Sequence, residues 1–145
     1  TGNFMTPITL YRVELDLRPV PLSVLVNGQR LPLQARVRTT GSGLAFELPD
    51  QMFLGTTPVS TMVIKRLVLD ADPNNQSITP SIVTDEGTTS LPPMQNTTRA
   101  QREWSLGLPG RPRQVVLDCD VTLINALYEA ELHLYVPSNG QRNAG

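Results

Sequence analysis

Apolar and polar residues alternate along much of this chain, which is the pattern of β-strands with one buried face. The clearest alternation lies within residues 8–18. There, apolar Val13, Leu15 and Leu17 are interleaved with polar Glu14, Asp16 and Arg18. Pro19 and Pro21 follow directly. Because proline cannot donate a ladder hydrogen bond, the prolines are expected to end this strand.

A tight β-hairpin is predicted between residues 23 and 33. Two apolar runs flank Asn27-Gly28, the dipeptide best suited to hold both central residues of a type I′ turn at positive φ. Pro32 lies in the second arm, which indicates that this arm lies at a sheet edge or contains a bulge.

Short strands separated by turns rich in Gly, Pro and Asn are predicted for most of the remaining chain. The further strand-like runs cover residues 44–48, 59–70, 77–84, 114–123 and 127–136. About eight strands with almost no helix predict an all-β fold, an antiparallel β-sandwich or jelly-roll-like barrel, in one domain of residues 1–145.

One segment lacks this periodicity. Residues 88–112 contain Pro92-Pro93 and the turn-like run 107–112 with two glycines, and they predict a long irregular excursion, with room for a short helix at 99–104. The polar residues 137–145 are expected to form a loose tail.

The amino-acid composition argues against several classes of function. Twelve basic and thirteen acidic residues leave a net charge of −1, which argues against direct nucleic-acid binding. No apolar run approaches the roughly 20 residues that span a bilayer. Cys119 and His133 are each the only residue of their type, which excludes an intrachain disulfide and a Cys/His zinc cluster.

A calcium loop is one candidate site. Asp70, Asp72 and Asn74 place oxygen ligands at alternate positions after a strand, as a calcium loop does. The same residue types are those that an ordinary turn prefers, and the glycine and glutamate of an EF-hand are missing. No other cofactor is expected.

Acidic residues near the C-terminus are a second candidate. Asp118 and Asp120 share one strand face, and Glu129, Glu131 and His133 share another. If these strands pair as a hairpin, their carboxylates meet and form a metal site or a pair for glycoside hydrolysis. The alternative is a solvated outer face. Cys119, between two aspartates, is interpreted as a small core residue rather than a nucleophile.

Apolar residues in loop-like places are candidates for protein contacts. The predicted interface residues are Met52, Phe53 and Leu54 in the loop 50–58, and Trp104, Leu106, Leu108 and Arg111 in the excursion. A lone tryptophan is found both as a core residue and as an interface anchor.

The strand pattern of most of the chain resembles that of the small jelly-roll or β-barrel capsid and decoration proteins of viruses, particularly of bacteriophages. The resemblance is architectural and implies a non-enzymatic subunit of a virion that associates with itself or with other capsid subunits as a homo-oligomer. The alternative is a calcium-assisted carbohydrate- or cell-surface-binding sandwich, located outside the cell or on its surface. An enzyme that uses Asp118, Glu129, Glu131 and His133 is a third reading.

Overall fold

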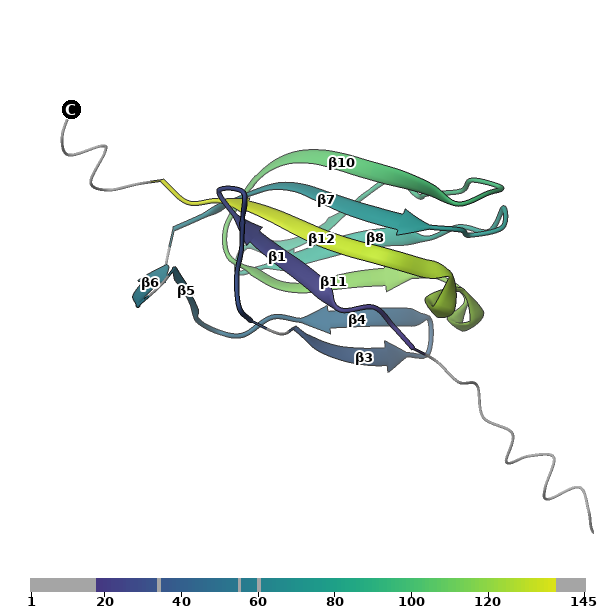
Figure 1. Ribbon diagram of the computed structural model, residues 1–145, viewed down its shortest axis with the longest axis horizontal. Coiled ribbons are helices and arrows are strands. Elements are labelled where there is room, and N and C mark those ends of the chain that lie inside the picture. Colours follow the sequence, from purple (N-terminus) through teal and green to yellow (C-terminus); the bar gives the residue numbers. More distant parts are fainter. Residues whose placement is uncertain (1–17, 34, 55, 60, 138–145) are drawn as a thin grey trace, which may run out of the picture.

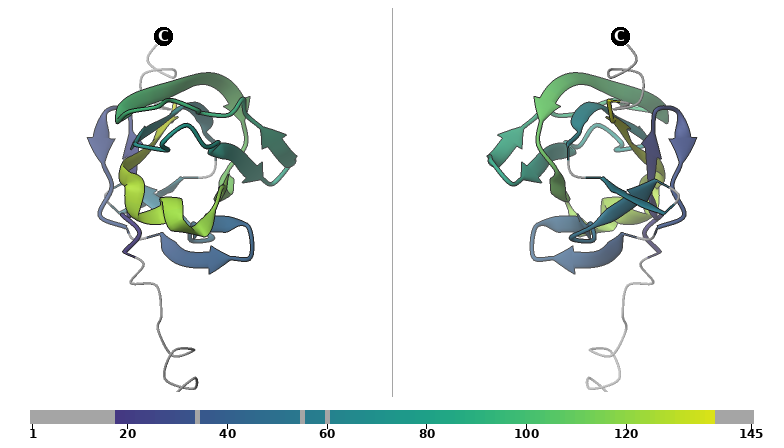
Figure 2. Two further views of the ribbon diagram at one scale, coloured as in Figure 1. Left: turned by 90° about the vertical axis from the view of Figure 1, so that its right-hand side faces the viewer. Right: turned by 90° about the vertical axis from the view of Figure 1, so that its left-hand side faces the viewer.

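The computed structural model describes residues 18–33, 35–54, 56–59 and 61–137. Within these residues, the chain forms two five-stranded sheets and a separate two-stranded hairpin. The sheets face each other across one hydrophobic core, and the end views show how they curl round it without joining into a closed barrel (Figures 1 and 2). The predicted all-β sandwich is therefore confirmed.

Sheet A has the order β10-β7-β12-β1-β2, with bounds Ala100–Pro109, Val63–Ala71, Leu127–Tyr135, Leu22–Val26 and Gln29–Arg30. Strand β7, which lies between β10 and β12, contains Lys65 within a run of apolar residues. The registers of both neighbouring strands shift at this point, so that Ile64 and Leu67 both reach the core while Lys65 is exposed. The β-bulge at Lys65 thus explains why a polar residue can interrupt the apolar run of β7.

Sheet B has the order β3-β4-β11-β8-β9, with bounds Arg36–Thr40, Gly43–Glu47, Pro112–Asp118, Thr79–Thr84 and Gly87–Ser90. All its ladders are antiparallel. Its inner face supplies Phe46, Val115 and Ile82, which are inaccessible to solvent. Each such buried side chain stabilises the fold by roughly 1.5–3 kcal/mol through removal of apolar area from water.

The predicted hairpin at Asn27-Gly28 is confirmed, since these residues have φ values of 50° and 85°. Its second arm, β2, is short and lies at the edge of sheet A, as Pro32 predicted. Asn27 also binds the residue that follows β12 (Leu127–Tyr135). Its amide side chain accepts a hydrogen bond from the Val136 N–H and donates one to the Val136 carbonyl, both at 3.0 Å.

The pairing of β1 with β12 is parallel, whereas the other ladders of the described residues are antiparallel. This ladder joins residues more than a hundred positions apart, for example Val24 and Leu132. It brings the two ends of the described chain into adjacent strands of one sheet (Figure 1).

The prediction for residues 88–112 is wrong for most of that segment. Strand β10 occupies residues 100–109, so the expected helix at 99–104 is not formed. Trp104 packs in the core and donates a hydrogen bond from Nε1 to the Pro92 carbonyl at 2.9 Å. Exposure alternates regularly along β10, with Trp104, Leu106 and Leu108 less exposed than the residues between them. The sequence did not indicate this strand because Gly107, Pro109 and Gly110 are residue types of turns.

Two other boundaries differ from the prediction. The strand expected at 114–123 ends at Asp118, and the 3₁₀ helix η1, Val121–Ala126, follows. Asp120 caps this helix, accepting a hydrogen bond from the Thr122 N–H at 2.9 Å, which lowers the pKa of the Asp120 carboxyl. The loop expected at 50–58 contains a hairpin of β5, Met52–Leu54, and β6, Thr57–Val59.

The strand predicted for residues 8–18 lies, apart from Arg18, outside the described residues, and so does the tail beyond residue 137.

Candidate functional site

The residues of the predicted calcium loop lie at the end of β7 and in the turn that follows. Asp70 is bound by Arg99, whose Nε and Nη2 each donate to one of its carboxylate oxygens at 3.1 Å. Asn74 occupies the predicted turn, with a φ of 52°. One of the three proposed ligands therefore already has a cationic partner.

The structure separates the predicted acidic constellation. Asp118 belongs to β11 in sheet B, whereas Glu129, Glu131 and His133 belong to β12 in sheet A, so the two strands do not form the expected hairpin. The physical reason is η1, which carries the chain from one sheet to the other. On β12, His133 Nε2 lies 3.0 Å from Glu131 Oε1.

A shallow cleft of about 200 Å³ lies beside the start of β1 and β12. It is lined by Val20, Pro21, Ser23, Arg30, Tyr128, Glu129, Ala130 and Glu131. Among the described residues, no three or more His, Cys, Asp or Glu side chains are arranged to hold a metal ion. The cleft therefore offers two carboxylates without a third metal-binding group beside them.

Cys119 directly follows β11, is half-buried and packs against the core. Burial raises the pKa of its thiol to about 11, with a further contribution from Asp118 and Asp120. These are the causes that the sequence indicated, because both burial and negative charge disfavour a thiolate.

We therefore expect Cys119 of the folded protein to be alkylated by iodoacetamide about 100-fold more slowly at pH 8 than a cysteine in a denatured chain, because thiolate is the reactive form. The rate should rise tenfold per pH unit towards pH 11. Mass spectrometry of timed reactions, with the protein in denaturant as the control, measures this ratio. Equal rates in the two samples would contradict the buried thiol.

The predicted interface residues have different positions in the fold. Met52 and Trp104 are buried in the core, which leaves them no surface for a partner in this structure. Leu106 and Leu108 are half-buried against the same core. Phe53 is exposed, with 46% of its surface accessible. Among the predicted interface residues whose side chains the structure describes, Phe53 is thus the one that presents a large apolar surface.

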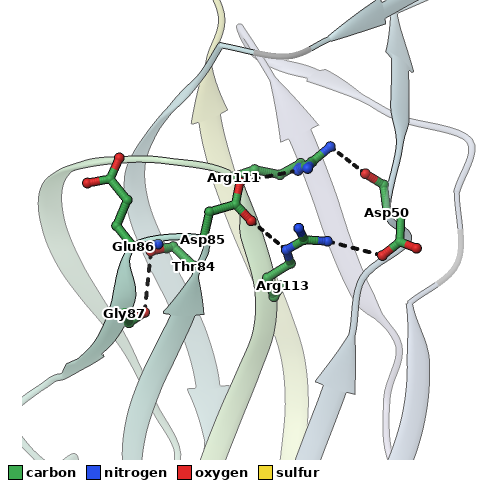
Figure 3. Close-up of polar contacts among 7 residues, drawn as sticks. All are labelled: Asp50, Thr84, Asp85, Glu86, Gly87, Arg111 and Arg113. Carbon is green, nitrogen blue, oxygen red and sulfur yellow. Dashed lines mark hydrogen bonds and ion pairs between the residues drawn. The ribbon is translucent and has the colours of Figure 1, made fainter.

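Arg111 belongs to a polar cluster at the end of the sandwich where β7 begins, which we call the arginine clamp: Arg111, Arg113, Asp50 and Asp85. Arg113 joins both carboxylates, with Nε 2.5 Å from Asp85 Oδ1 and Nη1 3.1 Å from Asp50 Oδ1 (Figure 3). Arg111 Nη1 donates to the main-chain carbonyl of Asp50 at 2.5 Å, and its buried Nε lies 3.6 Å from Asp85 Oδ2.

The arginine clamp holds three connections together: the segment before β5, the turn after β8 and the turn before β11. The Asp50 side chain is 94% exposed, so its ion pair with Arg113 contributes little to stability. The bond to the Asp50 carbonyl has a different effect, because it fixes the backbone two residues before the β5–β6 hairpin.

The β5–β6 hairpin projects from this end of the sandwich (Figure 1). It is attached through Met52 and Val59, which are both buried, while Phe53 and its cross-strand partner Pro58 are exposed. Residues 51–61 contain no charged side chain. Tyr135, also exposed, lies at the same end because it pairs with Val63, the first residue of β7.

The sequence identified Phe53 and Arg111 as contact residues but missed Asp50, Asp85 and Arg113, which complete the arginine clamp. Asp50 and Asp85 lie far apart in the chain, in turns that polar residues normally occupy, and Arg113 lies at the start of β11. Their opposite charges were the one signal in the sequence, and charge alone does not indicate which segments meet.

Comparisons with protein-family models, with curated proteins and with solved structures found no match to this chain. The fold and the geometry described above are therefore the basis for its function. Within the described part of the chain, no helix is both long enough and apolar enough to cross a bilayer.

Proposed function

We propose that this chain is a non-enzymatic structural subunit of a virus shell, which acts by association with copies of itself. The observation that carries the proposal is the β5–β6 hairpin, an uncharged element held outside the sandwich with Phe53 in contact with solvent. Large side chains that leave water on association supply most of the binding energy of an interface.

The way in which the hairpin is held supports the same role. Met52 and Val59 secure its two strands in the core, and the arginine clamp fixes the segment that leads into it. An element that is already ordered loses less conformational entropy when a partner binds, so less of the binding energy is lost.

The balance of charges favours protein partners over nucleic acid. Several arginines of the described chain form ion pairs with carboxylates of the chain itself, as in Arg99–Asp70 and Arg38–Glu47. A surface for phosphates needs a concentrated excess of basic residues. The proposed partners are therefore copies of the chain and other subunits of a shell, and the proposed location is the virion.

Light scattering coupled to size-exclusion chromatography tests this proposal. We expect the protein to form oligomers whose mass increases with concentration, and we expect Phe53→Ser to shift this association to at least about tenfold higher concentration. Tyr128→Ser is the matched control, because Tyr128 is an exposed aromatic residue at the other end of β12. It should leave the association unchanged.

A monomer at every concentration would contradict the proposed function. Addition of calcium to the same protein tests the alternative function. A calcium-assisted binding module should show a large rise in melting temperature on addition of calcium. We expect no such rise, because Arg99 occupies the carboxylate of Asp70.

A further inference from the structure

Strand β3 forms an open edge of sheet B. Within the described residues its one neighbour is β4. An edge strand presents unpaired main-chain N–H and C=O groups, and another extended segment can pair with them. Val37, on the inward side of β3, is only half-buried although it packs against the core. The β3 edge therefore has unpaired main-chain groups and an apolar side chain, Val37, that is only partly covered.

The outward side of β3 is positively charged. Arg36 and Arg38 lie on this side, opposite Glu47 and Ala45 of β4. Glu47 is the carboxylate that both arginines approach, at 4.0 Å from Arg36 Nε and 3.0 Å from Arg38 Nη2. The Arg36 side chain is 84% exposed. Two cations share one anion here, which leaves an excess positive charge at the edge.

Residues 8–17 have the complementary pattern. Their sequence predicts a strand with Val13, Leu15 and Leu17 on one face and Glu14 and Asp16 on the other. We propose that residues 8–17 of one copy of the chain pair as an additional strand with the β3 edge of a second copy. This inference rests on the proposed function and names a second contact between the copies, in addition to the β5–β6 hairpin.

One antiparallel register satisfies both faces. It places Asp16 opposite Arg36 and Glu14 opposite Arg38 on the outside. On the inside it places Leu15 opposite Val37, where it would cover the half-buried side chain. A shift by two residues in one direction would place Arg12 opposite Arg38. Cross-strand pairs of opposite charge stabilise a sheet and like charges destabilise it, so the charges select this register.

The other open edges fit the segment less well. The outward positions of β10 include Glu103, which would repel Glu14 and Asp16. Those of β9 are the uncharged Thr88 and Ser90, and β2 is only two residues long. Among the edges of the described chain, β3 is the one that offers two cations at adjacent outward positions.

The geometry favours a second copy over the same copy. The described chain starts beside η1, where the Arg18 N–H donates to Asn125 Oδ1 at 2.6 Å. The turn that ends β3 lies at the same end, because the Cys119 N–H donates to the Ser42 carbonyl (Figure 1). Residues 8–17 of the same copy would therefore run parallel to β3. A parallel ladder is less stable per residue than the antiparallel ones that build sheet B.

Charge reversal tests the pairing. The variant Glu14→Lys/Asp16→Lys should require about 10- to 100-fold higher concentration to associate, and so should Arg36→Glu/Arg38→Glu. An equimolar mixture of the two variants should recover part of the association, and all four changes in one chain should restore it. Glu103→Lys/Glu129→Lys, with the same change in net charge on sheet A, is the control and should associate normally.

Cysteine cross-linking tests which copy supplies the strand. In a Cys119→Ala background, Arg12→Cys and Thr40→Cys place thiols opposite each other in the antiparallel register. A mixture of the two single variants should form disulfide-linked dimers under oxidation, while neither variant should do so alone. A single chain that carries both substitutions is the comparison. If the disulfide forms only within that chain and not between the two single variants, the proposal is overturned.

The outcomes separate this inference from the proposed function. Association that persists unchanged in Glu14→Lys/Asp16→Lys, without cross-linking of the mixture, overturns the β3 contact and leaves self-association intact. A wild-type protein that is monomeric at every concentration overturns both. Association that is lost in both charge variants but not restored in the four-fold variant overturns the register.

Discussion

Replacement of Gly43 by alanine is expected to lower the free energy of unfolding by at least about 3 kcal/mol. Gly43 begins β4 with a φ of 140°, which L-residues with a side chain rarely adopt. A Cβ atom here would lie 2.0 Å from the Leu117 carbonyl oxygen and 3.0 Å from the Cys119 nitrogen. These are main-chain atoms of β11 and of the residue that follows it, so relief of the contact requires β4 and β11 to separate.

Gly41 is the matched control in the same turn, because no atom lies within 4 Å of the Cβ that Gly41→Ala would add. Gly41→Ala should leave stability unchanged or raise it slightly through a smaller entropy of the unfolded chain. Urea denaturation followed by tryptophan fluorescence measures both variants, since Trp104 is buried in the core. A loss below about 1 kcal/mol in Gly43→Ala would show that the strands tolerate a side chain at this position.

Phe46→Ala is expected to cost about 3–5 kcal/mol of stability. Phe46 is completely inaccessible to solvent and is the largest of the fully buried side chains. Its removal leaves a cavity between the sheets that Val115 and Val37, its neighbours on β11 and β3, cannot fill without movement of the backbone. The cost therefore includes the lost transfer energy and the unfilled volume.

The same substitution at Phe53 is the control, because Phe53 is exposed in the β5–β6 hairpin. Phe53→Ala should change the free energy of unfolding by less than about 1 kcal/mol. The comparison also separates stability from association, since Phe53 is the residue whose loss should weaken self-association. Equal losses for the two variants would mean that the hairpin packs on the sandwich rather than projecting from it.

Local patterns identified those elements whose cause is local. The positive φ at Asn27 and Gly28 follows from residue type, and so does the turn at Asn74 and Asn75. Alternation located β12, and short apolar runs between turn residues located β4, β7 and β8. These patterns missed β10, an edge strand that alternates in exposure but contains Gly107 and Pro109, which are residue types of turns.

The candidate site was predictable only in part. Phe53 was identified because an apolar residue in a loop is unusual. Trp104 was predicted as an interface residue, with a core position as the alternative, and the structure shows that it is buried and donates a hydrogen bond to the Pro92 carbonyl. The carboxylate partners of Arg111 and Arg113 come from turns distant in the chain, and no local signal links them.

The sequence by itself determined that this chain is built from strands with one apolar face, because period-two burial requires two sheets to cover each other. The tertiary structure alone decided which strands are neighbours. The parallel ladder of β1 and β12, the division of Asp118 from Glu129 by η1, and the arginine clamp at the base of the β5–β6 hairpin all join distant residues. Such contacts depend on how the sheets pack, which no local pattern encodes.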